Sequence, residues 1–333
     1  MKIESSYQQL IDEIRNTYIK GKTKSIKIVR RELVLTYWAV GKHIVEFEQK
    51  GKEKAIYGTK ILSKLSKDLS NQLGKGFSRT NLIYMRLIYL KYPKPNTLSD
   101  QLTWGHLVEL LSIENKLERN FYEKQAVAEK WTVRELKRQK NTALFLRLAA
   151  SKDKSGILKL SKSGIRPEKP TDLLRDPYVF EFLKIPEPYR ISEKELETRL
   201  LNNLQSFLLE LGKGFTFVGR QYRILIDNEY YKVDLVFYHR FLRCFVLIDL
   251  KIDKVKHQDI GQMNMYLGYF AKEEFHEGEN PPIGIILTRQ KDELLVEFAT
   301  YGMSSQLFVS KYQLYLPNEE ELRIQLEQIL SKE

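Results

Sequence analysis

The sequence predicts an all-α N-terminal domain followed by an α/β domain with a mixed sheet flanked by helices. Two patterns indicate this fold class. Through residues 5–150, apolar residues recur at spacings of three and four, as in Leu33, Tyr37 and Val40, which is helical periodicity. From residue 191 onward, one such helix is followed by short β-branched and aromatic runs typical of strands.

Within the N-terminal domain we expect a pair of helices joined by a glycine turn. The first covers about 58–72 and ends at the turn Gly74-Lys75-Gly76. Ser78 is placed to cap the second helix, Arg79–Lys91, which must stop before Pro93. This layout is that of a DNA-reading helix-turn-helix, although many such pairs never touch DNA.

The second helix of this pair begins with residue types suited to a nucleic acid. Arg79 and Asn81 stand in its first turn and Arg86 follows two turns later. Guanidinium and amide groups contact phosphates and base edges, so we expect these three residues to bind DNA. Further helices are expected at 103–113, 116–130 and 132–149.

The composition changes between the two domains. Residues 151–190 are rich in Ser, Lys, Gly and Pro with little periodicity, and we interpret them as a linker or arm. The predicted organisation is therefore a helical domain at 1–150, a linker at 151–190 and an α/β domain at 191–333. In the last of these, Asp227-Asn228 is expected to form a hairpin turn. The expected elements are helices at 192–211, 258–270 and 318–329, and strands at 215–221, 223–226, 230–238, 244–250, 282–287 and 307–310.

Charge is distributed unevenly along the 333 residues, which carry a net charge of +12. Residues 1–150 hold 29 Lys and Arg against 15 Asp and Glu, whereas residues 191–333 hold 17 against 22. A basic domain joined to an acid-bearing one favours a nucleic-acid grip joined to a metal-dependent enzyme, although lysine-rich helices are also simply soluble.

The apolar runs and the cysteine content bound the cellular setting. No apolar run reaches the roughly 18–20 residues of a membrane span, and the first residues lack a signal-peptide layout. The single cysteine, Cys244, excludes an intramolecular disulfide and suits a reducing compartment. We therefore expect a cytoplasmic protein with no membrane partner.

Two carboxylates interrupt the most strand-like part of the chain. Asp234 follows Val233 in one apolar run, and Asp249 ends the next one. A charge in an apolar strand is costly unless it is paired or binds a metal. Residues two apart in a strand share a face, so Asp249 and Lys251 project together. Carboxylates holding a hard divalent cation beside an ammonium explain this pattern, and a structural ion pair is the alternative.

This stretch resembles the PD-(D/E)XK nuclease superfamily and, more narrowly, the YhcG-like family of bacterial proteins. The resemblance is carried by Val233-Asp234 with Asp249-Leu250-Lys251, and by the segments LLELGKGFTFVGRQYRI, VDLVFYHRFLRCFVLIDLKI and GQMNMYL. It extends to LTWGHLVELLS and FYEKQAVAEKWTVRELKRQ in the N-terminal domain. Two departures are that Val233 replaces the proline of the motif and that the second acid is Asp249 where Glu is commoner.

The resemblance implies a restriction-endonuclease-like core and a metal-dependent nuclease. Mg²⁺, with Mn²⁺ as a substitute, would be held by Glu197, Asp234, Asp249 and the carbonyl of Leu250. Lys251 would orient or deprotonate the attacking water, or stabilise developing charge. The remaining implied roles are catalytic support from Gln262, and contacts with DNA from Gln221 and Tyr266.

Alternative functions stay open from the sequence. A non-catalytic DNA-binding adaptor that retains a nuclease fold and a nuclease acting on RNA are both compatible with it. Cutting of duplex DNA would favour a homodimer, with one site for each strand. No nucleotide cofactor is expected, because Gly74-Lys75 lacks the rest of a phosphate-binding loop. Defence, restriction or recombination are the roles that the resemblance suggests.

Overall fold

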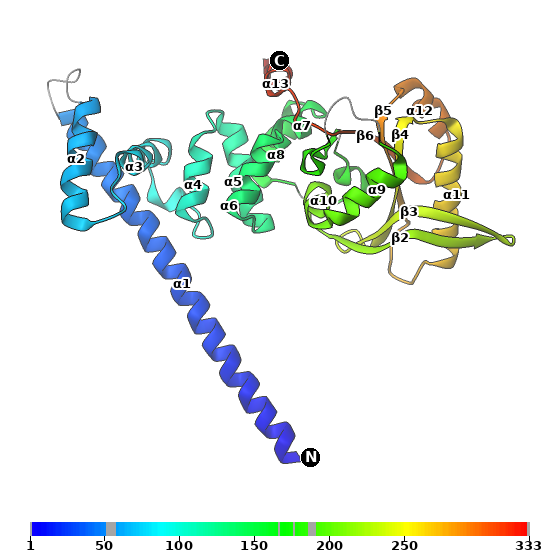
Figure 1. Cartoon of the computed structure of the whole chain (residues 1–333), viewed down its shortest axis with the longest axis horizontal. Coiled ribbons are helices and arrows are strands. Elements are labelled where there is room, and N and C mark those ends of the chain that lie inside the picture. The colour runs from blue at the N-terminus through cyan, green and yellow to red at the C-terminus, as the bar shows by residue number, and fades with distance from the viewer. Residues whose placement is uncertain (1, 51–57, 166, 176, 186–190, 332–333) are drawn as a thin grey trace. The chain divides into compact units, whose positions relative to one another are not determined.

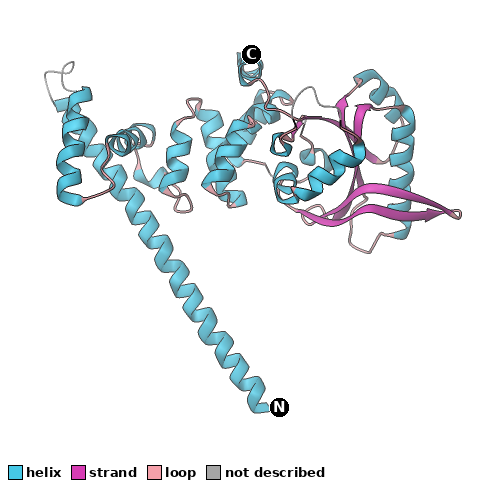
Figure 2. Cartoon of the chain, viewed as in Figure 1, coloured by secondary structure: helices cyan, strands magenta, loops and turns pink. Residues whose placement is uncertain are grey.

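The structure is a computed structural model that describes residues 2–50, 58–165, 167–175, 177–185 and 191–331 (Figure 1). The chain divides into two compact units, Met1–Lys137 and Arg138–Glu333. The described secondary structure of unit 1 is entirely helical, and unit 2 carries a mixed sheet with flanking helices (Figure 2). The predicted fold class is confirmed. None of the described helices is long and apolar enough to cross a bilayer.

Unit 1 is built around one long helix, α1 (Lys2–Lys50). Only its second part is packed: residues 10–33 are all exposed, and Val34 is the first buried position. The buried part crosses α3, where Ile44 meets Met85 in a shared core. The other helices that fall wholly or partly in this unit are α2 (Gly58–Leu73), α3 (Arg79–Lys91), η1 (Pro95–Thr97), α4 (Trp104–Leu111), α5 (Lys116–Glu129) and α6 (Val133–Asn141).

A glycine permits the close crossing of α1 and α3. A Cβ atom added to Gly41 would lie 2.0 Å from the carbonyl oxygen of Met85. Any side chain at this position would therefore force the helices apart. Because the backbones of α1 and α3 come this close at Gly41, the neighbouring side chains Ile44 and Met85 can pack in one core.

The α2–α3 pair has the geometry expected from the sequence. Gly74 and Gly76 adopt positive φ values of 84° and 132° in the turn. The Ser78 hydroxyl accepts a hydrogen bond from the backbone N–H of Asn81 at 3.3 Å, so the predicted N-cap is confirmed. Residues 51–57, which fall within the expected helical region, lie outside the described residues.

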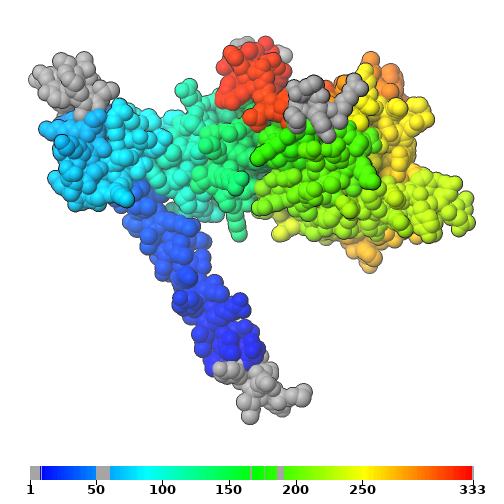
Figure 3. All heavy atoms as spheres, viewed as in Figure 1, coloured from blue at the N-terminus to red at the C-terminus, as the bar shows by residue number. Residues whose placement is uncertain are grey.

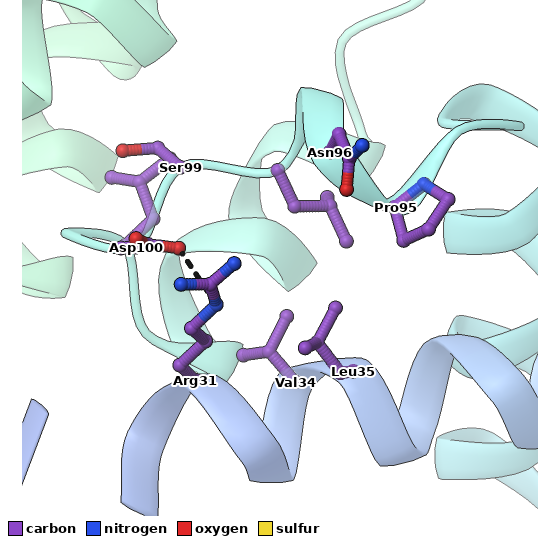
Figure 4. A pocket seen from close by; sticks show the side chains of 9 residues that line it. Arg31, Val34, Leu35, Pro95, Asn96, Ser99 and Asp100 are labelled. Atoms are coloured by element: carbon purple, nitrogen blue, oxygen red, sulfur yellow. Dashed lines mark ion pairs between the residues drawn. The ribbon is translucent and has the colours of Figure 1, made fainter. Parts of the chain in front are cut away.

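A small pocket lies where α1 enters the body of unit 1 (Figure 4). Arg31 of α1 reaches across it to Asp100, with Nε 3.2 Å from Oδ1. Val34 and Leu35 line its floor, opposite the start of η1 at Pro95. The pocket marks the point at which α1 becomes attached to the rest of the unit.

The helix expected at 132–149 is two helices, α6 and α7 (Leu144–Ala150). Ala143 between them has φ of 50°, and the buried Arg147 donates through Nε to the Thr142 carbonyl at 2.8 Å. An interior guanidinium therefore satisfies the carbonyl that the break exposes. Apolar periodicity continues across the break, which is why the sequence alone does not reveal it.

The segment expected to be a linker contains ordered elements. It forms α8 (Lys154–Ser163), η2 (Pro170–Leu173), β1 (Tyr178–Val179) and η3 (Glu181–Leu183). Tyr178, Val179 and Phe180 are completely buried, because β1 pairs in parallel with a later strand. The short apolar pieces between prolines thus belong to the core of unit 2. Residues 166, 176 and 186–190 of this segment lie outside the described part.

Unit 2 contains a six-stranded sheet in the order β1-β6-β5-β4-β3-β2. β2, β3 and β4 are antiparallel neighbours, whereas β4, β5, β6 and β1 run parallel. Asp227 and Asn228 form the β2–β3 turn with φ values of 45° and 66°, as predicted. The remaining strands are β2 (Phe215–Ile226), β3 (Glu229–His239), β4 (Cys244–Lys254), β5 (Ile283–Gln290) and β6 (Gln306–Gln313).

Helices cover both faces of this sheet. Leu196 and Leu200 of α9 pack on one face with Phe237, and Met263 and Phe270 of α11 pack on the other. The helix expected at 192–211 is broken at Asn203 into two, and the two strands expected at 215–226 are one. The helices of this unit after α8 are α9 (Glu193–Asn202), α10 (Leu204–Leu211), α11 (His257–Glu273), α12 (Glu293–Thr300) and α13 (Glu319–Ser331).

Candidate active site

The two strand carboxylates meet where β3 and β4 stop pairing. The registered pairs of this ladder end at Leu235 and Ile248, one residue short of both acids. Beyond that point the Asp234 carboxylate replaces the ladder, because its Oδ2 accepts the backbone N–H of Leu250 at 2.9 Å. Asp249, 5% exposed, lies beside it in β4. The sequence reasoning that placed both acids together is supported by this geometry.

Gln221 links Asp234 to a third carboxylate. Its Nε2 donates to Asp234 Oδ1 at 3.0 Å and to Glu197 Oε2 at 2.7 Å. Gln221 has φ of 46°, an uncommon conformation for a residue with a side chain. Just before it, the β2–β3 register shifts between Phe217 and Gly219. The irregular strand therefore places the Gln221 amide between the two carboxylates. The sequence predicted a contact between Gln221 and DNA, whereas in the structure its side chain lies within the acidic cluster.

Burial and the nearby charge of Asp234 raise the pKa values of Asp249 and Glu197. Burial, followed by the charge of Asp234, raises the pKa of Asp249 to about 7, and the neighbouring Lys251 only partly opposes this. Burial and Asp234 also raise the pKa of Glu197, against the hydrogen bond from Gln221. Neighbouring carboxyl groups disfavour each other's ionisation. A bound cation would compensate their negative charges and so favour the ionised forms.

Lys251 stands over the carboxylates as the strand period predicts. Its Nζ lies 2.8 Å from Asp249 Oδ2 and 3.7 Å from Asp259 Oδ1. Burial alone would lower the pKa of this ammonium, but Asp249, and to a smaller extent Glu193 and Asp259, raise it above the ordinary value. Lys251 is therefore a cation at neutral pH. As such it serves as a donor and a positive charge.

Asp259 is a site residue that the sequence analysis missed. It stands at the start of α11, where its Oδ2 accepts the backbone N–H of Lys256 at 2.7 Å and its Oδ1 faces Lys251. The signal was an acidic residue in the first turn of the helix that follows the strand of Lys251, a position that usually indicates only a helix cap.

The carboxylates of this cluster can meet the needs of a divalent cation. Among the residues that the structure describes, no three His, Cys, Asp or Glu side chains converge as a ready-made metal cage. The Gln221 amide stands between Glu197 and Asp234. Mg²⁺ usually takes one or two protein carboxylates and completes its shell with water and substrate oxygens. Asp234 and Asp249 fit that requirement, and the Gln221 amide links Glu197 to Asp234.

Two predicted site residues form hydrogen bonds with each other and with the backbone of β3. Tyr266 is 1% exposed, and its hydroxyl donates to the Lys232 carbonyl at 3.0 Å. Gln262 donates to that same hydroxyl from one turn earlier on α11. Tyr266 is thus a core residue in this arrangement, which differs from the expected contact with phosphate, and Gln262 is engaged with it. The side chain of Leu250 is buried, and a role for its carbonyl stays a prediction.

The three residues expected to contact DNA from α3 are in different situations. Arg79 is exposed at the start of the helix. The Asn81 side chain donates to the Gly76 carbonyl at 2.9 Å and so stabilises the turn. Arg86 forms an ion pair with Glu48 of α1, with Nε 2.7 Å from Oε2. Of the three, Arg79 is exposed, whereas Asn81 and Arg86 are half-buried.

Similar proteins share both parts of the chain. A family described as "YhcG PDDEXK nuclease domain" matches residues 171–327, and one described as "DUF1016 N-terminal domain" matches residues 13–147. A protein of Escherichia coli (strain K12) named "Putative nuclease YhcG" is 37% identical over an alignment that covers 97% of this chain and 94% of that protein.

Two solved structures resemble a part of the chain. One is described as the crystal structure of a repair endonuclease from Pyrococcus abyssi, with 20% identity and a TM-score of 0.28. The other, described as the structure of an EndoMS-dsDNA2 complex, has 16% identity and a TM-score of 0.27. Each match covers 40% of this chain and 50% of the other, and at these scores neither decides anything about substrate. The sequence matches do identify the family: the chain belongs to the YhcG family, whose C-terminal part is a PDDEXK nuclease domain.

Proposed function

We propose that this protein is a divalent-metal-dependent deoxyribonuclease that hydrolyses phosphodiester bonds at the cluster of Asp234, Asp249 and Lys251. The observation that carries the proposal is the convergence of two neighbouring carboxyl groups and an ammonium where the paired part of the β3–β4 ladder ends. Membership of a PDDEXK nuclease family supports the reaction class. DNA as the substrate, and Mg²⁺ with Mn²⁺ as a substitute, are part of the proposal.

The side chains have separable roles in this reaction. Asp234 and Asp249 hold the cation, which when bound supplies a Lewis acid and lowers the pKa of its water. Lys251, kept protonated by Asp249, donates to the attacked phosphate or orients the water. Gln221 fixes Glu197 and Asp234 relative to each other. The backbone N–H of Leu250 keeps Asp234 from rotating away.

The direct test is incubation of the whole chain with plasmid, linear and branched DNA. We expect cleavage that requires added Mg²⁺ or Mn²⁺ and that EDTA abolishes. Plasmid nicking separates endonuclease from exonuclease action, and an RNA of the same sequence tests substrate class. Cleavage that continues without any divalent metal would contradict the proposal, as would no cleavage of any of the four substrates.

Metal affinity should depend on pH because binding must displace the proton of Asp249. With its pKa raised to about 7, this carboxyl is protonated in the metal-free fold below that pH. We expect Mg²⁺ affinity to fall by about tenfold for each pH unit below about 7 and to level off above about 8. Calorimetric titration at pH 6, 7 and 8 in buffers of different ionisation enthalpy measures both the affinity and the proton released. An affinity that does not change across this range would contradict the assignment of Asp249 as a ligand.

We further propose that unit 1 supplies affinity for DNA, on the basis of the positive surplus in residues 1–150. Arg79→Ala should weaken DNA binding severalfold and reduce the slope of log affinity against log salt by about 1. Arg86→Ala should act mainly on stability, because Arg86 holds Glu48. Fluorescence anisotropy with EDTA present measures binding without cleavage.

The control for this experiment is Arg323→Ala, which removes an exposed arginine of α13 that is paired with Glu319. It should leave affinity and salt slope unchanged. If Arg323→Ala weakens binding as much as Arg79→Ala does, the α2–α3 pair is not the binding element.

A further inference from the structure

The first part of α1, residues 10–33, presents an apolar stripe that no other described element of unit 1 covers. Figure 3 shows this part of the helix extending away from the other helices of unit 1. Ile14, Tyr18 and Ile28 are 61%, 69% and 51% exposed. Positions 11, 14, 18, 21, 25 and 28 follow alternating spacings of three and four, the pattern of a coiled-coil seam. The residues of this seam are Ile11, Ile14, Tyr18, Gly21, Ser25 and Ile28.

We propose that the seam binds the same seam of a second copy of this chain, with the two helices antiparallel. In an antiparallel pair centred between residues 19 and 20, two residues face each other when their numbers add up to 39. Tyr18 then faces Gly21 of the other copy, Ile14 faces Ser25, and Ile11 faces Ile28. Every small seam residue lies opposite a large one, which is the alternation that fills a helix interface.

The parallel arrangement fails on the same criterion. Each seam position would then face its own counterpart, so Gly21 would meet Gly21 and Ser25 would meet Ser25. Two successive layers would lack side chains to fill them, next to a layer with two tyrosine rings. The sizes of the residues therefore select the antiparallel orientation.

Gly21 itself supports a partner at this position. Glycine in a helix interior is destabilising relative to alanine, and a Cβ at Gly21 would have no neighbouring atom within 4 Å. No residue in the described part of the protomer requires a glycine there. In the antiparallel pair, the missing side chain is the space that the Tyr18 ring of the other copy fills.

The charges on α1 favour the same orientation. Residues 20–31 carry six Lys and Arg and no acid, whereas Asp12 and Glu13 precede them. Antiparallel pairing places Asp12 opposite Lys27 of the other copy and Glu13 opposite Ile26, next to that lysine, whereas parallel pairing would stack the cations on cations. An unfavourable juxtaposition is Arg15 opposite Lys24, where exposure to water and salt screens the repulsion.

The helix is already formed before it pairs. Residues beyond Val34 are packed in unit 1 and held by the Arg31–Asp100 contact, so the free part extends an existing helix and needs no new nucleus. Ordering of the seam on dimerisation is correspondingly less costly. Two copies joined in this way carry two carboxylate sites, which would allow one site for each strand of a duplex. That consequence rests on the proposed function, but the pairing of the two helices does not.

Sedimentation velocity of the full chain, with matched variants, tests the pairing. The parent should form a dimer of the 39.4 kDa chain as its concentration is raised to roughly 100 µM. Concentrations this high are needed because small interfaces bind weakly. Tyr18→Glu should raise the dissociation constant at least tenfold. Ile19→Glu places the same charge on the opposite side of the helix, where Ile19 is also exposed, and should change the constant less than twofold.

Cysteine cross-linking tests the orientation, because the native Cys244 is buried. Ile11→Cys mixed with Ile28→Cys should give a disulfide-linked dimer under mild oxidation, whereas each variant alone should not. A monomeric parent, equal effects of Tyr18→Glu and Ile19→Glu, or cross-linking of Ile11→Cys to itself would each overturn the proposal. Protection of α1 from exchange only when DNA is added would also overturn it, and would identify nucleic acid as the partner. Loss of cleavage in an intact dimer would instead bear on the proposed function alone.

Discussion

Asp249→Asn is expected to reduce phosphodiester cleavage by roughly a thousandfold or more while leaving DNA binding intact. The change keeps the size of the side chain but removes the charge that holds the cation, and with it several kcal/mol of transition-state stabilisation. Asp234→Asn should act similarly, and it also alters the acceptor that the Leu250 N–H needs. Single-turnover cleavage assays with saturating enzyme separate the chemical step from binding.

Stability distinguishes a metal site from a structural ion pair. Without metal, the folded protein prefers Asp249 protonated, so its contribution makes the free energy of unfolding fall as pH rises from about 4 to about 7. Asn removes this penalty, and the metal-free variant should be as stable as the parent at pH 8 or more so. If Asp249 instead served only to neutralise Lys251, the change would cost roughly 3–5 kcal/mol.

The control is Asp253→Asn, which lies four residues later in the same strand and is exposed. It should retain cleavage, stability and Mg²⁺-dependent stabilisation. A large loss of melting temperature in Asp249→Asn, together with no effect of Mg²⁺ on the parent, would mean that Asp249 and Lys251 hold the sheet together and that the nuclease proposal is wrong.

The main components of the site were accessible from the sequence because they obey the period of a strand. Asp249 and Lys251 project to one face by that rule, and their 2.8 Å contact follows from it. Asp234 occupies the equivalent place in the neighbouring strand of an antiparallel pair, so register brings it near. These inferences needed no tertiary information beyond the adjacency of two consecutive strands.

The rest of the site depends on backbone irregularities that the sequence does not encode locally. Gln221 reaches Glu197 and Asp234 through a positive φ and a preceding register shift at Gly219, and the positive φ of Gln221 has no glycine or proline to signal it. Arg86 has the residue type and helix position of a DNA contact, and it also forms an ion pair with Glu48, 38 residues earlier in the chain. Residue type alone does not predict a long-range pairing of this kind.

The end of the expected helical region shows the same limit on a larger scale. Glu210 in α10 has no exposed surface and accepts hydrogen bonds from Arg147 at 2.8 Å and from the backbone of Val179 at 2.9 Å. Arg138 and Arg175 approach its other oxygen at 3.3 and 3.8 Å. One buried carboxylate therefore fastens α6, α7 and β1 to the nuclease core, across the segment that composition alone indicated as a linker.

Glu210→Gln is accordingly expected to destabilise unit 2 by roughly 3–5 kcal/mol, because it leaves buried guanidinium groups without their counter-charge. Burial by itself would raise the pKa of Glu210, but Arg147, Arg175 and Arg138 lower it below the ordinary value. A depressed carboxyl pKa stabilises the fold above the unfolded value of about 4.3, and that contribution is lost as the pH falls through the folded pKa. The parent should therefore lose stability in acid more steeply than Glu210→Gln does. Urea unfolding at pH 7 and pH 4 measures both effects, with Glu195→Gln, in a half-exposed pair with Arg199, as the control expected to change stability by less than about 1 kcal/mol. A Glu210→Gln protein with the parent's urea midpoint would show that the arginines around Glu210 are solvated in solution and that this cluster does not hold the segment in place.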